Sequence, residues 1–171
     1  MIETSRLRIR RLAPADAPFI VSLLNDPAFL RYIGDRNVRS VADAVAYIAD
    51  GPAASHARFG FGLDAVETLG GESMGICGLL RREELDAPDL GFAFLPAFRG
   101  RGFAREASEA VLDDAAGRLA VRRVLAVVQA DNDASIGLLA RLGFRFERMA
   151  DIRGESLRLY ARVLQNLNAE G

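Results

Sequence analysis

The sequence contains only one cysteine, Cys77, and only one histidine, His56, in 171 residues. One cysteine cannot form a disulfide within the chain, and one cysteine with one histidine cannot build a structural zinc site. A catalytic cysteine needs a base beside it, whereas His56 lies in a stretch that reads as a loop. We therefore expect Cys77 to be a small core residue, and the sequence predicts no metal site.

Long apolar runs and an excess of one charge are also missing. No run approaches the ~18 apolar residues of a membrane-spanning helix, and the N-terminus, MIETSRLRIRRL, is unlike a signal peptide. With 22 basic and 23 acidic residues, the formal net charge is -1. This balance provides no overall field for nucleic acid or for an anionic membrane. We expect a cytoplasmic protein that binds neither, and any anion site must be local.

What the sequence does contain is a regular alternation of element types. Half of its residues are hydrophobic, which is enough for one domain with a core over residues 1–171. Residue patterns predict strands at 6–12, 58–66, 73–81, 90–95, 123–129, 144–149 and 157–164, and helices at 16–24, 40–48, 102–119 and 133–142. The hairpins among these strands must be antiparallel, so we predict an α/β (α+β) fold with a mixed sheet. Residues 29–39 have no clear period and read as a loop.

The most informative segment, AFRGRGFARE, follows the apolar run LGFAFLP. It places Gly100 and Gly102 where a strand ends and a helix begins. The first N–H groups of a helix lack acceptors, and the helix dipole adds about half a positive charge there. Glycine lets a phosphate approach the backbone, and Arg99, Arg101 and Arg105 can add charge at the rim. The segment predicts a pyrophosphate site, with an ordinary helix start and solvated arginines as the alternative.

Two common nucleotide-binding motifs do not fit this segment. The G-x-G-x-x-G pattern fails because Arg105 stands at the place of the third glycine, and no early strand precedes it in the expected position. A Walker A loop is excluded because no G-K-[ST] follows. The pyrophosphate must belong to another kind of ligand.

Two segments together resemble the GNAT superfamily of acyl-coenzyme A dependent N-acetyltransferases. RGRGFA matches the family's [QR]-x-x-G-x-[GA] coenzyme A loop and follows the strand and proline, GFAFLP, that usually precede it. QADNDASIGLLARLGFRFE resembles the second signature, in which an asparagine opens a helix that ends in L-G-F. The resemblance covers nearly the whole chain. It is closest to the RimJ/RimL-like subgroup, which acetylates the N-termini of ribosomal proteins.

The resemblance implies a single-domain GNAT fold with a twisted, mostly antiparallel sheet of about seven strands flanked by helices, in which the fourth and fifth strands splay apart. It also implies acetyl-CoA as cosubstrate. In the family, pantetheine lies in the splay like an extra strand, and a backbone N–H near Phe94 would polarise the thioester carbonyl. The positions that match the family's coenzyme A contacts are Phe92, Phe94, Arg99, Gly100, Arg101, Gly102, Phe103, Ala104, Arg105, Asn132 and Ser135. The alternative for Asn132 and Ser135 is a role only as helix caps.

The sequence departs from the family at two positions that usually move protons. Many relatives carry a tyrosine where this chain has Leu139, and protein-acetylating relatives often carry a glutamate where it has Val127. We expect Asp89, at the head of the strand along the cleft, to accept the amine proton through water. Ser135 is the expected partner of the departing thiolate. The other candidates are Glu72, Glu83, Glu84 and Tyr160.

Three classes of function follow from these observations. The first is an acetyl-CoA-dependent N-acetyltransferase that acts on a protein N-terminus or a small amine by direct attack in a ternary complex. The second is a non-catalytic acyl-CoA sensor of the same fold, because Leu139 and Val127 cannot transfer protons. A nucleic-acid-binding module comes last, because no basic stripe with interleaved aromatic residues occurs. The amine acceptor, and the choice between monomer and homodimer, stay open.

Overall fold

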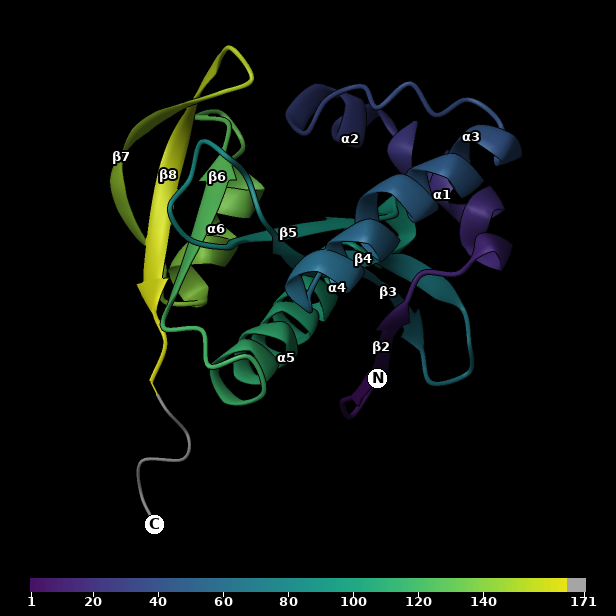
Figure 1. The fold of residues 1–171 in the computed structure, drawn as a ribbon, viewed down its shortest axis with the longest axis horizontal. Coiled ribbons are helices and arrows are strands. Elements are labelled where there is room, and N and C mark those ends of the chain that lie inside the picture. Colours follow the sequence, from purple (N-terminus) through teal and green to yellow (C-terminus); the bar gives the residue numbers. More distant parts are fainter. Residues whose placement is uncertain (166–171) are drawn as a thin grey trace.

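One sheet with helices on both faces organises the chain (Figure 1). The computed structural model describes residues 1–165. The strand order is β1-β2-β3-β4-β5-β6-β8-β7, and every neighbouring pair is antiparallel except β5 and β6. The strands are β1 (Ile2–Glu3), β2 (Leu7–Arg11), β3 (Leu63–Thr68), β4 (Ser73–Leu80), β5 (Asp89–Phe94), β6 (Arg123–Val128), β7 (Arg145–Ile152) and β8 (Glu155–Val163). The helices are α1 (Ala17–Leu24), α2 (Pro27–Tyr32), α3 (Val41–Ile48), α4 (Ala54–Phe59), α5 (Phe103–Gly117) and α6 (Asp133–Arg141).

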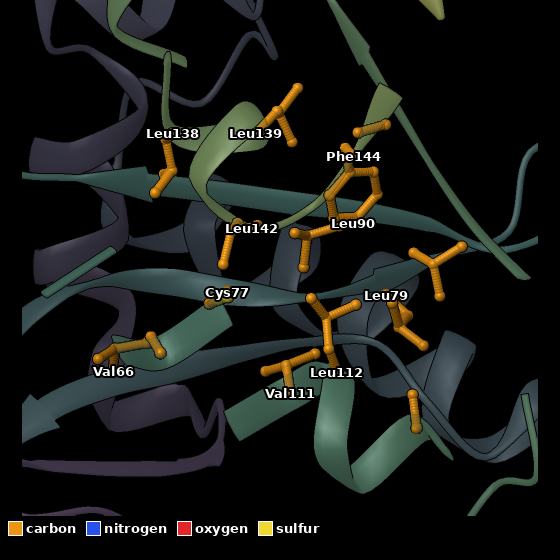
Figure 2. Close-up of a cluster of buried hydrophobic side chains, with 14 of the residues drawn as sticks. Val66, Cys77, Leu79, Leu90, Val111, Leu112, Leu138, Leu139, Leu142 and Phe144 are labelled. Atoms are coloured by element: carbon orange, nitrogen blue, oxygen red, sulfur yellow. The ribbon is translucent and has the colours of Figure 1, made fainter. Parts of the chain in front are cut away.

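The period-two pattern of the central strands supplies each face of the sheet with its own apolar layer. Cys77 and Leu79 on β4 face α5 and α6, whereas Ile76 on the same strand faces α1 and α3. In α5, buried residues recur every three or four positions, which gives the helix one apolar side. Val111 and Leu112 of α5 point toward β4 in the main core (Figure 2). Burying a side chain such as Leu112 contributes ~1.5–3 kcal/mol.

The two central parallel strands, β5 and β6, pair at only one position. The registered pair is Asp89 with Leu125, at the first residue of β5. On its other side, β5 pairs with β4 along its whole length. The two strands therefore separate toward their C-terminal ends, which confirms the predicted splay. The splayed pair was expected to be the fourth and fifth strands, and the extra short strand β1 makes them the fifth and sixth.

Three local expectations differ from the structure. The sheet has eight strands instead of about seven, because Ile2–Glu3 pairs with β2. The strand predicted over residues 58–66 is wrong in its first half, where α4 continues to Phe59 and β3 begins only at Leu63. Part of the predicted loop 29–39 is helix α2. Its start is set by Pro27 in the first turn and by the Asp26 carboxylate, which accepts a hydrogen bond from the Phe29 N–H at 3.3 Å.

Gly75 of β4 sits opposite Phe94, and no larger residue fits there. A Cβ at this position would lie 2.3 Å from the Ala93 carbonyl oxygen and 2.8 Å from the Phe94 ring. We expect Gly75→Ala to lower the free energy of unfolding by at least ~2 kcal/mol, which corresponds to a melting temperature roughly 4–8 °C lower. Circular dichroism during heating measures this change.

The matched control is Gly117→Ala at the end of α5, where a Cβ would meet nothing within 4 Å. Alanine in a helix is more favourable than glycine by about 0.5–1 kcal/mol, so this variant should melt at the same temperature or higher. Equal losses in the two variants would contradict the packing argument.

Within residues 1–165, no helix combines the length and the apolar character that crossing a membrane requires. In the same part of the chain, no three histidine, cysteine, aspartate or glutamate side chains gather closely enough to hold a metal ion.

Candidate functional site

The first turn of α5 has no protein cap. Gly102 occupies the N-cap position with a φ of 80°, a conformation that side chains disfavour, and it has no side chain to accept from the helix. The first helical bond runs from the Glu106 N–H to the Gly102 carbonyl at 3.1 Å. Among the described residues, nothing accepts from the N–H groups of Phe103, Ala104 and Arg105. Three free donors at the positive end of the helix dipole are able to bind an anion.

The loop before this turn leaves room for an anion. Gly100 has a φ of 71°, and a Cβ there would meet nothing within 4 Å. Arg101 is exposed and lies over the Phe103 ring, with its guanidinium carbon 5.0 Å from the ring centroid. Arg105 is exposed and forms an ion pair with Glu109 at 3.0 Å. Both arginines are exposed beside the first turn of α5.

Arg99 is also exposed, with 42% of its side-chain surface accessible, but its guanidinium is paired with groups of the protein. Its Nε donates to the carbonyl oxygen of Phe94 at 3.0 Å, and its guanidinium forms an ion pair with the buried carboxylate of Asp26. Because Asp26 also caps α2, Arg99 links the glycine-rich loop to both β5 and α2. This pairing helps to hold the loop in place.

The edge of β5 that faces β6 carries unpaired backbone groups. Alternate residues of an antiparallel strand direct their polar groups to opposite edges. The Leu95 N–H donates to the Met74 carbonyl at 2.9 Å, so odd-numbered residues bond toward β4. The backbone N–H and C=O groups of Phe92 and Phe94 therefore point toward β6. In the described part of the chain, Asp89 is the one residue of β5 that pairs with a residue of β6. The Phe94 carbonyl accepts a hydrogen bond from Arg99. The N–H of Phe94 and the N–H and C=O of Phe92 are therefore available to an extended ligand.

Asn132 caps α6, which begins where β6 ends. Its Oδ1 accepts a hydrogen bond from the backbone N–H of Ser135 at 3.3 Å. Within residues 1–165, the amide nitrogen of Asn132 and the hydroxyl of Ser135 have no partner, and both side chains are half-buried. Because β5 and β6 separate toward their C-terminal ends, the first turns of α5 and α6 both follow strands at the open end of the splay.

Asp89, the predicted proton acceptor, is almost completely buried, with 1% of its surface exposed. Its Oδ2 accepts from Arg82 Nε at 3.0 Å, and its Oδ1 has no partner in the described part of the chain. Burial raises the pKa of Asp89, while the charge of Arg82 opposes that shift. Phe92 is three positions further along the strand, roughly 10 Å away, so proton exchange with a group at that position requires intervening water.

The other candidates for proton transfer are less well placed. Tyr160 is buried, and its hydroxyl accepts from Arg158 Nη1 at 3.1 Å. Leu139 is 1% exposed within the main core, and Val127 is a half-buried residue of β6. Neither side chain can carry a proton, which the sequence analysis noted. Three further candidates are exposed: Glu72, Glu83 and Glu84.

The lone cysteine and histidine both have structural surroundings. Cys77 is fully buried, and burial raises the pKa of its thiol to about 12, so it does not supply a thiolate. His56 lies in α4, not in the loop that the sequence suggested. Its Nε2 is 2.7 Å from Asp64 Oδ1 on β3, which ties α4 to the sheet.

Two ion pairs near the site involve residues that the sequence analysis did not select. Arg82, in the loop between β4 and β5, pairs with Asp89, and Asp26 pairs with Arg99. No local signal in the sequence could have grouped these residues, because only the packing of the chain brings each pair together.

The site joins two features that serve one kind of ligand. A strand edge with free backbone groups suits a pantetheine arm, and the uncapped, glycine-started helix beside it suits a pyrophosphate. This combination in a mixed sheet defines the class of acyl-CoA-dependent N-acyltransferases. The chain belongs to the GNAT family of that class, because the acetyltransferase (GNAT) domain matches residues 6–145.

A relative of similar length supports the family membership. The uncharacterized N-acetyltransferase YoaA of Bacillus subtilis (strain 168) is 30% identical over 151 residues, which cover 86% of this chain and 84% of that protein. The family membership predicted from the two motifs is therefore confirmed, and the protein is an acetyl-CoA-dependent acyltransferase of the N-acetyltransferase type.

Solved structures share the fold. An acetyltransferase from Agrobacterium tumefaciens str. C58 superimposes with a TM-score of 0.81 at 24% identity, over 94% of this chain and 92% of that one. RimL, a ribosomal L7/L12 alpha-N-protein acetyltransferase solved with coenzyme A, gives a TM-score of 0.81 at 21% identity, over 94% and 96%. An acetyltransferase from Salmonella typhimurium that modifies the N-terminal serine of L7/L12 gives 0.80 at 19%, over 95% and 97%.

Proposed function

We propose that this protein transfers the acetyl group of acetyl-CoA to a primary amine, either a protein N-terminus or a small amine, by direct attack in a ternary complex. The observation that carries the proposal is the unpaired edge at Phe92 and Phe94 next to the uncapped helix start at Gly102. A ligand that is extended at one end and doubly anionic at the other uses both features at once.

In this proposal each part of acetyl-CoA has its own set of residues. The pyrophosphate accepts from the first N–H groups of α5, and the pantetheine amides pair with β5. Asn132 and Ser135 add hydrogen bonds through the side-chain groups that capping leaves unused. The complete set is Phe92, Phe94, Arg99, Gly100, Arg101, Gly102, Phe103, Ala104, Arg105, Asn132 and Ser135. The reaction requires no metal ion.

The chemistry forms a bond between the amine nitrogen and the carbonyl carbon and breaks the bond from that carbon to sulfur. The free N–H of Phe94 donates to the carbonyl oxygen, on which negative charge develops. One proton leaves the nitrogen through water to the unpartnered Oδ1 of Asp89. The hydroxyl of Ser135 passes a proton to the departing thiolate and takes up in its place, through water, the proton that Asp89 received from the amine. Most of the rate enhancement comes from holding amine and thioester together.

A non-catalytic acyl-CoA sensor is the second candidate. It is favoured by one observation: the positions at which relatives carry an acid and a base hold Leu139, which is buried in the core, and Val127. A sensor would keep the whole coenzyme A site and lack acceptor-dependent turnover.

The test is calorimetric titration with acetyl-CoA, followed by an assay of free-thiol release against N-terminal peptides, polyamines and aminoglycosides. The chain contains no lysine, so in the assay its own primary amines are limited to the N-terminus. Binding with acceptor-dependent thiol release is the expected result. Binding without release from any acceptor would favour the sensor, and no binding would overturn the assignment of the glycine-rich loop.

A further inference from the structure

The short turn between β1 and β2 lies against the first turn of α5. Hydrogen bonds close this turn: the Thr4 N–H donates to the Leu7 carbonyl at 2.9 Å, and the Leu7 N–H donates to Thr4 Oγ1 at 3.0 Å. Leu7, the first residue of β2, is completely buried in the main core. The closed turn and its buried anchor fix the place from which the Arg6 side chain extends.

Arg6 contacts the glycine-rich loop and α5 at three points. Its Nη1 donates to the carbonyl oxygen of Arg101 at 3.1 Å, and its Nε donates to the Glu106 carboxylate at 3.3 Å. Its guanidinium carbon lies 4.3 Å from the centroid of the Phe103 ring. These contacts lie on both sides of Gly102, the N-cap of α5. Arg6 is therefore held beside the free N–H groups of the first turn.

The remaining nitrogen of this guanidinium, Nη2, faces the N-cap. A Cβ added to Gly102 would lie 3.5 Å from Arg6 Nη2. Within residues 1–165, Nη2 donates to no acceptor, so both of its N–H groups are free. The Arg6 side chain is 45% exposed, which leaves it open to a ligand from solvent. A guanidinium nitrogen and the uncapped helix start thus offer donors at one place.

The carboxylates around the loop do not cancel its positive charge. Each of three carboxylates pairs with one arginine; the pairs are Glu106 with Arg6, Asp26 with Arg99, and Glu109 with Arg105. Arg101, the fourth arginine, forms no ion pair with any residue that the structure describes. One unpaired cation and the positive end of the helix dipole remain for an anion. Since the pair with Glu106 engages only Nε, Arg6 can bind a second acceptor.

We propose that Arg6 binds a phosphate oxygen of acetyl-CoA through Nη2, while its Nε and Nη1 hold the first turn of α5 and the loop before it. This rests on the proposed use of acetyl-CoA. It adds a residue from the N-terminal turn, which lies outside both motifs, to the coenzyme contacts on β5, α5 and α6. Arg6 then serves the nucleotide half of the coenzyme and not the pantetheine arm.

The first experiment titrates acetyl-CoA and each of its halves into Arg6→Met by calorimetry. The halves are 3′-phospho-ADP, which carries the phosphates, and S-acetylpantetheine, which carries none. We expect Kd to rise about tenfold or more for acetyl-CoA and for 3′-phospho-ADP, and to stay unchanged for S-acetylpantetheine. Arg6→Lys should restore part of the loss, because it keeps the charge but not the fork of donors. An equal rise for both halves would indicate a distorted site and overturn the proposal.

The matched control is Arg58→Met. Arg58 is an exposed arginine of α4 whose guanidinium also lies over a phenylalanine ring, with its carbon 4.9 Å from the Phe59 centroid. It makes the same kind of contact outside the proposed coenzyme site, so its loss should change none of the three Kd values. Equal Kd values for acetyl-CoA in the Arg6 and Arg58 variants would overturn the proposal.

Glu106→Gln separates a direct phosphate contact from a role in holding the helix. The amide keeps the shape of the side chain but removes the charge that Arg6 neutralises. If Nη2 binds the phosphate, this variant should bind acetyl-CoA at least as tightly as the unmodified protein. If Arg6 only fixes α5 through Glu106, the variant should lose as much affinity as Arg6→Met, and that result would overturn the direct contact.

Turnover and the unmodified protein complete the test. With an acceptor that releases thiol, Arg6→Met should raise KM for acetyl-CoA about tenfold and leave kcat at saturation unchanged. If the unmodified protein binds acetyl-CoA and Arg6→Met binds it equally well, the role of Arg6 fails and the proposed function stands. If the unmodified protein binds neither acetyl-CoA nor 3′-phospho-ADP, the proposed function itself fails.

Discussion

Gly102→Glu is expected to weaken acetyl-CoA binding about a hundredfold or more, a loss of ~3 kcal/mol. The new carboxylate would stand at the N-cap of α5, beside the free N–H groups of Phe103, Ala104 and Arg105. It would repel the pyrophosphate and could itself accept from these donors, as N-cap side chains do. Calorimetric titration of acetyl-CoA into the variant measures the loss.

A matched control separates this effect from backbone strain. Gly71 lies in the turn between β3 and β4 with a φ of 92°, and a Cβ there would meet nothing within 4 Å. Gly71→Glu therefore introduces the same charge at a similar conformational cost, but outside the proposed coenzyme site. Its affinity for acetyl-CoA should match that of the unmodified protein. If both variants retain full affinity, the assignment of the loop is wrong.

Asp89→Asn should lower kcat/KM by about 10²–10³ while acetyl-CoA still binds. The amide keeps the shape of the side chain but cannot take a proton from the amine. Steady-state thiol release, with an acceptor that the thiol-release assay has identified, measures the rate. Thermal denaturation in parallel shows whether the variant is folded. A rate within about threefold of the unmodified protein would remove Asp89 from the mechanism.

The pH profile distinguishes a proton acceptor from a residue that only supports the structure. Burial places the pKa of Asp89 above the ordinary carboxyl value of about 3.9. Because the base must be ionised, kcat/KM should fall as the pH drops through this raised pKa, and Asp89→Asn should lack this decrease. Arg82→Met removes the charge that opposes the shift, so the decrease should move to higher pH. Activity lost equally at every pH would indicate a structural role.

The free energy of unfolding should also depend on pH through the titration of Asp89. A carboxyl whose pKa is raised on folding contributes fully in its neutral form, below the pKa of the unfolded chain. This contribution is lost as the pH rises through the higher pKa of the folded state. In Asp89→Asn, which does not titrate, this part of the pH dependence should be absent from denaturant unfolding measured across the same range.

Local features of the sequence predicted most of the fold because they act over a few residues. Gly102 reads as a helix start from its neighbours alone, and the structure shows an uncapped first turn there. Asn132 was expected to contact the ligand, with a helix cap as the alternative, and the structure shows that it caps α6. Helix α2 was missed although Asp26 and Pro27 form a recognisable start, because the residues after them show no helical period.

Contacts between distant segments could not be predicted in the same way. Arg99 was expected at the rim of the anion site, but its partner Asp26 is 73 positions away in the chain. Arg82 was not selected by its pattern, and it pairs with Asp89 only because the loop between β4 and β5 folds back. The role of such side chains depends on which chain segments pack beside them, and the hydrophobic periodicity of a segment does not predict its distant neighbours.

The sequence by itself determined the family and the helix start with free N–H groups, because a glycine-rich junction between strand and helix is set by local geometry. Only the tertiary structure decided which backbone groups of β5 stay unpaired and that Arg82 pairs with Asp89. The free edge depends on how far β6 diverges, and the ion pair depends on the packing of the loop between β4 and β5. Both are set by long-range packing, whose energy is distributed over many contacts and has no signature in any short segment.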